Sequence, residues 1–286
     1  MLHSLDHVIL AVRDLEAGLE IWSRLLGRAP SWHGEHPGAG TANVLYRLQN
    51  TYLELLAPQG QGHLGAWLGD HLEKHGEGVL GAAFGTADAD ACAAAWREAG
   101  LHPAPVEEGA GRDVHSGATR AWRSVRLPAG ETRGARIFAI QHLSATDTLP
   151  IARALGEEAS CVHGLDHAVL RTADPEAALR LYGEQLALRL ALDRSFPQWG
   201  ARLQFFRVGG VTWEVASQLE GGDRDAPDRL WGLSFRVVDG GAARGRLLEG
   251  GFEVSDLRPG RKPGTRVLTV LAPTCGVPTL LLEPAA

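Results

Sequence analysis

The feature that most constrains this chain is an apolar strand that carries one histidine and occurs twice. Residues 5–12 contain Leu5-Asp6-His7 followed by five aliphatic residues, and residues 165–170 begin with Leu165-Asp166-His167. Each copy is followed by an apolar strand with one carboxylate. The same 47 residues separate His7 from Glu54 and His167 from Glu214. This fixed spacing indicates an internal duplication, and it makes the two His/Glu pairs the candidate functional residues.

The residues around each histidine predict a repeated α+β unit. Apolar residues on both faces of 5–12 predict a strand that is covered on both sides. Asp14 is expected to cap a helix, and two strands joined by a turn at Gln49-Asn50 are expected to follow it. An offset of 160 residues carries this pattern into the second half of the chain. A second unit, with a strand starting within 101–106, recurs at an offset of 151 residues.

The chain is therefore expected to contain four units in the order ABA′B′. We predict an N-terminal domain at 1–145, with units at 3–58 and 78–145. A C-terminal domain is predicted at 164–286, with units at 164–219 and 230–286. The segment between them contains Pro150 and a polar stretch, which is typical of a domain boundary.

Composition excludes several classes of function. The net charge of −6 and the pI near 6.1 argue against a nucleic-acid partner. The three cysteines are far apart, which favours neither a disulfide framework nor a cysteine zinc site. No apolar run is long enough to span a membrane, and a strand rather than a signal peptide is expected at the N-terminus. We expect a cytoplasmic monomer or homodimer with a small-molecule partner and no membrane partner.

Paired βαβββ units with these motifs resemble the vicinal oxygen chelate superfamily, and the first half resembles its glyoxalase-like members. The superfamily also contains bleomycin-resistance proteins and extradiol dioxygenases. The motifs that carry the resemblance are Leu5-Asp6-His7, Arg13-Asp14-Leu15, His36-Pro37-Gly38 and Tyr52-Leu53-Glu54-Leu55. The resemblance implies an α+β fold in which the four units pair into two glyoxalase-like, cup-shaped barrels. Pairing of units across the two halves is an alternative that the sequence leaves open.

The resemblance also implies a divalent metal at the floor of a cup. In the first cup, His7, Glu54 and Gln141 match the ligand positions, whereas Gly81 falls on a position where it cannot ligate. His142 is expected on the opposite face of its strand. His167 and Glu214 mark a possible second site, Gly232 is again unable to ligate, and the fourth position falls on an aliphatic residue or Glu283. The donor set suits Fe, Mn, Ni, Co or Zn, and a protein without metal is the alternative.

Other side chains are candidates for contact with a substrate. His36, Thr41 and Asn43 lie where a glycine-rich loop enters a strand, although turn formation and capping explain them equally well. Alternation along the strand places either Trp122 or Arg123 inside the first cup, and Arg123 suits an anionic substrate group. For the two histidines, the alternative to a metal is a core residue that forms a hydrogen bond with the neighbouring glutamate.

Two functional hypotheses follow from the resemblance. The first is a metal-dependent lyase, isomerase or dioxygenase that acts on a small oxygenated metabolite, with Glu54 as the catalytic base. The second is a metal-free protein that sequesters a drug or an aromatic ligand, as bleomycin-resistance proteins do. Because the second half lacks the His-Pro-Gly loop, the first cup is expected to be the active one.

Overall fold

Each copy of the histidine strand lies at the centre of its own mixed β-sheet. The structure is a computed structural model that describes residues 1–36, 38–221 and 223–285. The first sheet has the strand order β2-β3-β4-β1-β5-β8-β7-β6. Its strands are β1 (Leu2–Ala11), β2 (Trp32–His36), β3 (Thr41–Arg47), β4 (Tyr52–Pro58), β5 (Gly78–Thr86), β6 (Glu107–Arg112), β7 (Thr119–Arg126) and β8 (Ile137–His142).

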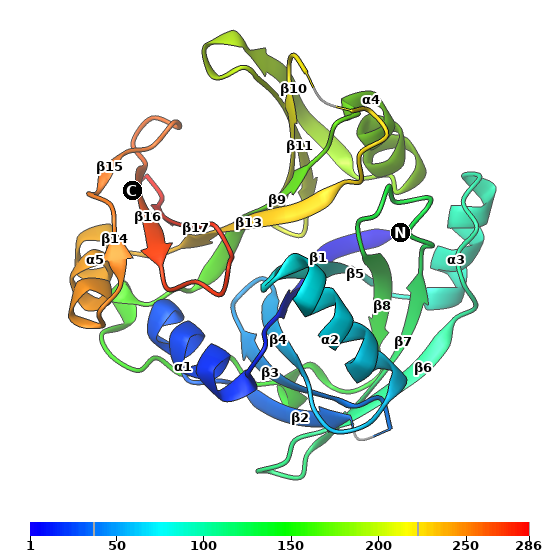
Figure 1. Ribbon diagram of the computed structural model, residues 1–286, viewed down its shortest axis with the longest axis horizontal. Helices are drawn as coiled ribbons and strands as arrows, with labels where there is room; N and C mark the ends of the chain where they lie inside the picture. The colour runs from blue at the N-terminus through cyan, green and yellow to red at the C-terminus, as the bar shows by residue number, and fades with distance from the viewer. Residues whose placement is uncertain (37, 222, 286) are drawn as a thin grey trace.

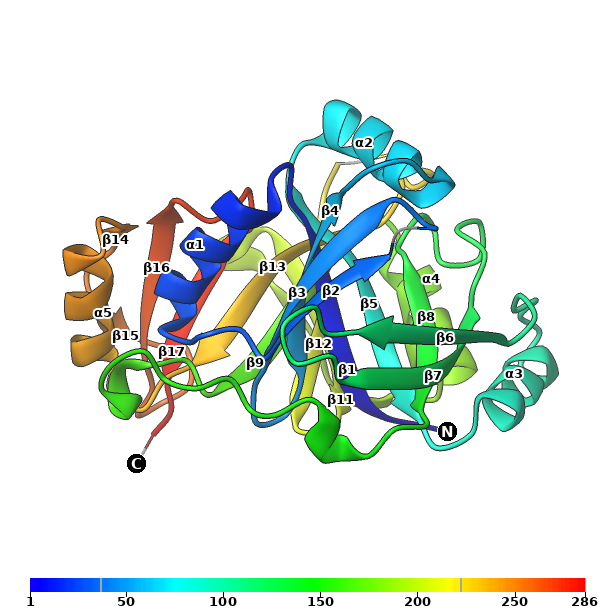
Figure 2. The same cartoon turned by 90° about the horizontal axis from the view of Figure 1, so that it is seen from below.

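The second sheet repeats this arrangement, in the order β10-β11-β12-β9-β13-β17-β16-β14 with β15 paired to β16. Its strands are β9 (Gly164–Arg171), β10 (Arg189–Phe196), β11 (Ala201–Val208), β12 (Val211–Gln218), β13 (Arg229–Arg236), β14 (Glu253–Val254), β15 (Arg258–Pro259), β16 (Arg266–Ala272) and β17 (Thr279–Glu283). Strand β1 pairs with β5, and β9 pairs with β13. Consecutive units therefore share a sheet, which confirms the α+β fold of paired units and excludes pairing across the halves (Figures 1 and 2). The division into two domains, whose predicted end at residue 286 lies outside the described residues, stays a prediction.

Among the described residues, four of the five α-helices begin after an aspartate whose side chain caps them, whereas the helix after Gly62 has no side-chain cap. The helices are α1 (Leu15–Leu26), α2 (His63–His75), α3 (Ala89–Glu98), α4 (Pro175–Ala178) and α5 (Gly240–Glu249). Asp14 accepts a hydrogen bond from the amide of Ala17 at 2.9 Å, as the sequence predicts for an N-cap. Helix α1 is followed by Gly27 as its C-terminal cap, and the left-handed conformation of this residue (φ 70°) suits glycine. No helix among the described residues is long and apolar enough to cross a membrane.

The expected strand at 101–106 is wrong, because β6 begins at Glu107. Pro103 and Pro105 each lack an amide donor, so they interrupt any regular ladder there. Between them, Ala104 donates one isolated hydrogen bond to the carbonyl of Arg126. The segment therefore follows the sheet without joining it as a strand.

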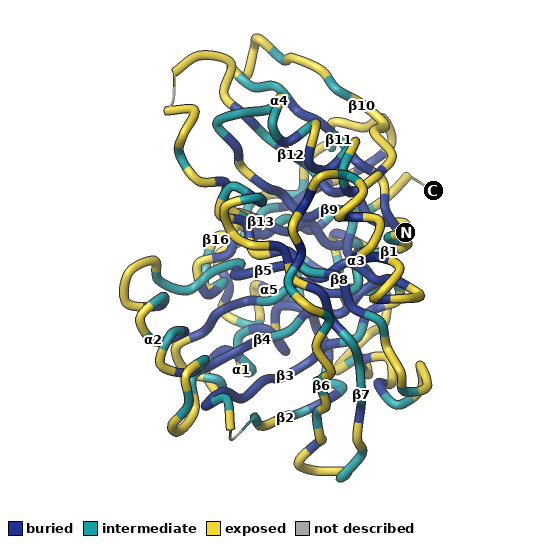
Figure 3. The backbone as a smooth tube through the Cα atoms, turned by 90° about the vertical axis from the view of Figure 1, so that its right-hand side faces the viewer, coloured by how far each residue is buried: buried dark blue, intermediate teal, exposed yellow. Residues whose placement is uncertain are grey.

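A single hydrophobic core joins the two halves. Trp22 of α1 packs edge-on against Phe235 of β13, with ring centroids 6.0 Å apart. Phe84 of β5 contacts Trp213 of β12 in the same way at 5.3 Å. All four side chains are fully buried. In Figure 3 the buried backbone runs through the central strands of both sheets, whereas the outer segments are exposed.

The first sheet is nearly closed, whereas the second is an open curve (Figure 1). A backbone bridge joins Gly34 of β2 with Asp113, which follows β6, and the Asp113 carboxylate accepts a hydrogen bond from the amide of His33 at 2.7 Å. Helix α2 buries Leu68 and Leu72 against one end of this closed sheet. Leu149 covers the other end by packing against Trp32 and Tyr52. Apolar side chains therefore cover both ends of the first sheet.

Candidate functional site

The structure brings His7 and Glu54 together, 47 residues apart in sequence. Strand β1 runs parallel to β4, with His7 opposite Tyr52 and Ile9 opposite Glu54. Nε2 of His7 lies 3.6 Å from a carboxylate oxygen of Glu54. The imidazole stacks on Tyr52, with ring centroids 4.5 Å apart, and meets the edge of Phe138 at 5.5 Å. These aromatic contacts fix the orientation of the ring.

Asp6 holds the other nitrogen of His7. The pairing of β1 with β5 shifts register between Leu5 and His7, and this irregularity lets Asp6 reach back to its neighbour. Nδ1 of His7 lies 2.8 Å from the Asp6 carboxylate, and Nε2 of His142 lies 2.9 Å from the same group. Burial raises the pKa of Asp6, but the hydrogen bonds from His142 and His7 outweigh it and hold this pKa well below its usual value.

The contact with Asp6 determines what Nε2 of His7 presents to Glu54. An ionised carboxylate only accepts hydrogen bonds, so Nδ1 is the donor. In the neutral imidazole, Nε2 then carries a lone pair that faces the Glu54 carboxylate across 3.6 Å. The other oxygen of Glu54 accepts a hydrogen bond from Nδ2 of Asn43 at 2.8 Å. Two acceptors that converge in a buried site require a proton or a cation between them.

The second half repeats this geometry. Nε2 of His167 lies 3.5 Å from Glu214, and Nδ1 lies 3.0 Å from the Asp166 carboxylate. Arg236 of β13 donates to Asp166 at 2.8 Å, so this aspartate also has a second partner, as Asp6 has in His142 of β8. Burial raises the pKa of Asp166, but the hydrogen bonds from His167 and Arg236 outweigh it and lower this pKa to about 2. Burial raises the pKa of the Glu214 carboxyl, against the attraction of His167.

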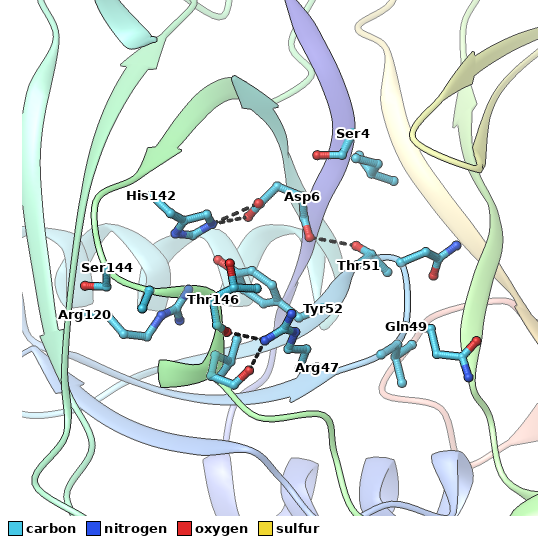
Figure 4. Close-up of a pocket in the computed structure, with 15 residues that line it drawn as sticks. Ser4, Asp6, Arg47, Gln49, Thr51, Tyr52, Arg120, His142, Ser144 and Thr146 are labelled. Carbon is cyan, nitrogen blue, oxygen red and sulfur yellow. Dashed lines mark hydrogen bonds and ion pairs between the residues drawn. The ribbon is translucent and has the colours of Figure 1, made fainter. Parts of the chain in front are cut away.

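The two pairs differ in accessibility. The side chains of His7 and Glu54 are 4 % and 13 % exposed, whereas those of His167 and Glu214 are 21 % and 15 % exposed. Beside the first pair, a cavity of about 250 Å³ is lined by Asp6, Tyr52, Arg120 and His142 (Figure 4). His7 does not line this cavity, because Tyr52 stacks over it. A molecule in the cavity meets Asp6 and His142 first.

Gln141, the expected third ligand, is engaged elsewhere. Its side-chain oxygen accepts a hydrogen bond from the amide of Ala89 at 3.0 Å, at the start of α3. It therefore lies on the helix-covered face of β8, opposite to the face of Phe138 and His142. This corrects the expectation for both residues, since alternation places His142, not Gln141, on the side of His7.

The two glycines at ligand positions have a packing reason. A Cβ atom at Gly81 would lie 3.2 Å from the carbonyl of Arg136, and one at Gly232 would lie 2.8 Å from the carbonyl of Pro278. Neighbouring backbone therefore excludes a side chain at Gly232 and makes one a tight fit at Gly81. Glu283, the alternative fourth position of the second cup, instead accepts hydrogen bonds from Arg266 and from the amide of Gly240.

Of the residues predicted to contact a substrate, some lie at the first His/Glu pair and others do not. Nδ1 of His36 lies 3.1 Å from the hydroxyl of Thr41 across the β2–β3 hairpin, and Pro37 lies outside the described residues. Asn43 contacts Glu54 directly, so it belongs to the site of the first pair. The guanidinium of Arg123 binds Asp90 on α3 at 2.6 Å, which turns it away from the cup. Trp122, its neighbour, takes the inward position, beside Gly109.

Sequence reasoning missed three residues around the first pair. Asp6 orients His7, His142 shares Asp6, and Arg120 lies over the rings of Trp32 and Tyr52 at 5.6 and 5.4 Å. The signal for Asp6 was present, because an aspartate precedes the histidine in both copies. A carboxylate behind a histidine ligand is a common device for fixing its tautomer. Nothing in the sequence indicated that Arg120 would approach β4.

Each His/Glu pair fits a divalent cation as a set of two protein donors. The lone pair of Nε2 and the carboxylate converge, and the aspartate on Nδ1 supplies the usual outer support. A protein cage of three or more ligands is not present: the described residues contain no group of three or more His, Cys, Asp or Glu side chains that is able to hold a metal ion. Further coordination positions would have to be filled by oxygens of solvent or substrate.

Comparisons with known proteins agree with this fold. The sequence profile of a family described as "Glyoxalase-like domain" matches residues 5–186, more than half of the chain. A search of curated proteins gave no match.

Among solved structures, a variant of 4-hydroxymandelate synthase from Streptomyces coelicolor is similar over 100 % of this chain and 94 % of its own, with 14 % identity and a TM-score of 0.69. A hypothetical protein from Staphylococcus aureus is similar over 98 % and 99 %, with 10 % identity and a TM-score of 0.65. At these identities the two likenesses establish the fold alone.

A methylmalonyl-CoA epimerase from Streptomyces coelicolor is 27 % identical over 50 % of this chain and 97 % of its own, with a TM-score of 0.40. This last likeness is too low in TM-score to carry an argument. The family match and the two sheets of paired units lead to one conclusion. The chain belongs to the glyoxalase-like domain family, within the vicinal oxygen chelate superfamily.

Proposed function

We propose that this protein is a metal-dependent enzyme that acts on a small oxygenated metabolite, by lyase, isomerase or dioxygenase chemistry. One observation carries the proposal. In both halves Nε2 of a histidine faces a carboxylate at 3.5–3.6 Å while an aspartate occupies Nδ1. A cation shared by the two acceptors accounts for the arrangement and for its repetition.

A bound divalent ion would polarise adjacent oxygens of a substrate and stabilise the negative charge that develops on them. The protein contributes orientation and proton transfer. Asp6 and Asp166 fix the ring nitrogens that face the glutamates. The base that we propose for removing a proton from a carbon next to a carbonyl group is Glu54 or Glu214. Burial raises the pKa of Glu214, which brings it closer to the range that suits a general base.

Accessibility favours the second pair as the one that a substrate reaches. His167 has a side chain 21 % exposed on an open sheet, against 4 % for His7 inside a nearly closed one. The sequence favours the first cup because of its His-Pro-Gly loop. Both pairs therefore enter the test, and the proposal names His167 and Glu214 as the substrate-facing pair. His7 and Glu54 form the more enclosed ion site.

The second candidate function is metal-free binding of a drug or an aromatic ligand. The donor count favours it, because Gly81 and Gly232 supply no ligand and Gln141 caps α3. Under this alternative each histidine is a core residue, and one proton between its Nε2 and the glutamate takes the place of the cation. The two functions differ in one measurable property, the stoichiometry of bound metal.

Metal analysis of protein purified without chelators tests the proposal. After incubation with Fe²⁺, Mn²⁺, Co²⁺, Ni²⁺ or Zn²⁺ and removal of free ion, we expect one or two equivalents of one metal per chain. His7→Ala and Glu54→Ala should each remove the ion of the first half, and His167→Ala and Glu214→Ala that of the second. His102→Ala is the matched control, since His102 is an exposed histidine paired with Glu131.

Two results of the metal analysis would contradict the proposal. A folded protein that retains none of these ions, or that loses them equally in the His102 variant, contradicts the metal-dependent enzyme. Saturable binding of an aromatic ligand by that metal-free protein would then support the sequestering function.

A further inference from the structure

A large cleft lies between the two halves, and none of the four side chains of the His/Glu pairs lines it. Its volume is about 810 Å³, within the range that small-molecule sites occupy. The first half contributes the end of α2, the start of β5 and the residues before β8. The second half contributes the ends of β9 and β12 and the start of β13. Neither His167 nor Glu214 is among the described residues that line it.

The duplication contributes equivalent segments of both halves to this cleft. Residues 76–80 line it from the first half, and residues 227–231 line it from the second. These segments correspond at the offset of 151 residues found in the sequence. Gly134 and Gly276, which precede β8 and β17, also line it, one from each half. The cleft is therefore a product of how the two halves dock, and it has no counterpart within one half.

Three arginines concentrate positive charge in the cleft. Arg136 comes from the first half, and Arg171 and Arg229 come from the neighbouring strands β9 and β13, where they are paired across the ladder. None of the three forms an ion pair or a side-chain hydrogen bond with the part of the chain that the structure describes. Like charges opposite each other on adjacent strands are unfavourable. Such an arrangement in a chain with net charge −6 favours an anionic ligand.

Two of the guanidinium groups are held in position by tryptophans. Arg136 lies 3.8 Å from the ring centroid of Trp67, and Arg171 lies 3.9 Å from that of Trp231. Stacking fixes the plane of a guanidinium group and leaves its N–H donors at the edge available for oxyanions. Trp231 lines the cleft and is 39 % exposed, so a planar part of a ligand has a ring face to contact.

Two carboxylates also line the cleft, and each has one oxygen in a hydrogen bond or ion pair with a group outside the three arginines. Asp228 is buried, accepts a hydrogen bond from Thr172 at 2.7 Å and pairs with Arg133 at 3.2 Å. Glu77 accepts a hydrogen bond from the amide of Arg13 at 2.8 Å. Burial lowers the pKa of His71, and so do His75, Arg136 and Arg229, so the neutral form of this histidine is favoured. The positive charge of the cleft therefore comes from its arginines, and His71 of the first half is close enough to Arg229 of the second to respond to it.

We propose that this cleft binds a multiply charged organic oxyanion, through the guanidinium groups of Arg136, Arg171 and Arg229. The charged groups of the ligand are phosphates or carboxylates, since both match the arginine fork. The size of the cleft admits a ligand as large as a nucleotide. The proposed site uses none of the side chains of the His/Glu pairs.

Isothermal titration calorimetry of the full-length protein tests this site. The probes are pyrophosphate, ATP, citrate and, as an uncharged comparison, adenosine. We expect saturable binding of at least one of the three anions and none of adenosine alone. Stronger binding of pyrophosphate or ATP than of citrate would identify phosphate as the recognised group, and the reverse order would identify carboxylate. The affinity for the anion should fall as the NaCl concentration rises from about 50 to about 500 mM, because salt screens the attraction between the anion and the arginines.

Variants locate the site. Arg171→Ala and Arg229→Ala should each weaken binding about tenfold or more, because each removes charge-assisted hydrogen bonds. Arg229→Lys keeps the charge without the fork and should weaken it less. Arg97→Ala, an exposed arginine on α3, is the control and should leave the affinity unchanged. Binding of no anion by the folded wild type, or an equal loss in Arg97→Ala, would overturn the proposal.

Discussion

At the scale of single residues, the sequence predicted which residues lie close together more accurately than it predicted which way their side chains point. The spacing of His7 and Glu54 correctly indicated a contact, because a parallel strand pair brings them to one face. Gln141 and Arg123 lie one residue from inward-pointing positions, and each turned out to face α3. A register shift of one residue moves a side chain to the other face of a strand. Irregularities such as the one beside Asp6 have no clear signature in a single sequence.

Asp6 should make the free energy of unfolding decrease as the pH is lowered into the acid range. Its pKa is depressed in the folded state, so its contribution is present above its usual value of 3.8 and is lost as the pH falls toward the lower folded value. Asp6→Asn should lower the free energy of unfolding by about 1–3 kcal/mol at pH 7. The difference from wild type should shrink below pH 4. Urea unfolding at pH 7 and pH 3 measures both quantities.

Asp147→Asn provides the control for this experiment, since Asp147 is an exposed residue of a short surface turn. It should have little effect at either pH. A loss in Asp6→Asn that is equally large at pH 7 and pH 3 would contradict the depressed pKa.

Glu214 should behave in the opposite way. Its pKa is raised by burial in the folded state, so this group favours the folded protein less as the pH rises from 4.5 through the folded value. In metal-free protein at pH 7, Glu214→Gln should therefore raise the melting temperature by roughly 2–4 °C, the shift that about 1 kcal/mol produces in a chain of this size. The gain should disappear near pH 4.

Differential scanning calorimetry of the apo protein measures this effect. Glu249→Gln, at an exposed position on the last turn of α5, should leave the melting temperature unchanged. A lower melting temperature for Glu214→Gln in apo protein would show that ionised Glu214 is stabilised by its neighbours.

At the scale of elements, the sequence predicted most strands and helix starts, because each depends on local signals. Asp14 caps α1 as expected, and the turn at Gln49-Asn50 joins β3 to β4. The sequence did not indicate that the side chain of Asn50 would reach the other half. It pairs with the amide and the carbonyl of Leu165 at 3.0 and 2.8 Å. Contacts of this kind depend on docking, which a local pattern does not encode.

Gln141 should act as a structural residue of α3 and not as a metal ligand. Its oxygen accepts from the amide of Ala89 in the first turn of that helix. Gln141→Ala should therefore lower the free energy of unfolding by about 0.5–2 kcal/mol, the usual cost of losing a side-chain cap. Denaturant unfolding and metal analysis of the same sample measure the two properties.

Asp88→Ala removes the other side-chain acceptor at this helix start, and a similar loss of stability is expected. A Gln141 variant with unchanged stability and a lower metal content would instead assign it to the metal site.

At the scale of the whole molecule, the duplication was visible in the sequence, but the difference between the halves was not. Closure of the first sheet depends on the bridge at Gly34 and Asp113, which are far apart in the chain. The cleft between the halves depends on the way that the two copies dock. Both features arise from contacts between segments that are far apart in the chain, so no local sequence motif predicts them. The motifs pointed to the first cup, whereas side-chain exposure points to the second.

The predicted domains should not unfold independently. Trp22 and Phe84 of the first half pack on Phe235 and Trp213 of the second, so separation would expose four large aromatic side chains. The full chain should therefore melt in one cooperative transition. A fragment of residues 1–145 should bind a hydrophobic dye and show no sharp melting transition. Co-expression with residues 146–286 is the control and should restore it, whereas a cooperative transition of the isolated fragment would contradict the shared core.

The closure of the first sheet also has a consequence for association between molecules. A sheet whose outer strands meet offers few free backbone groups to a neighbouring chain, whereas an open sheet keeps its edges. The second sheet ends at β10, whose Leu190 and Leu192 are 39 % and 40 % exposed. The same strand carries Arg189, Asp193 and Arg194, and charged side chains on an edge oppose strand addition. Resistance of this protein to aggregation should therefore depend on the charged side chains of β10, at the edge of the open second sheet.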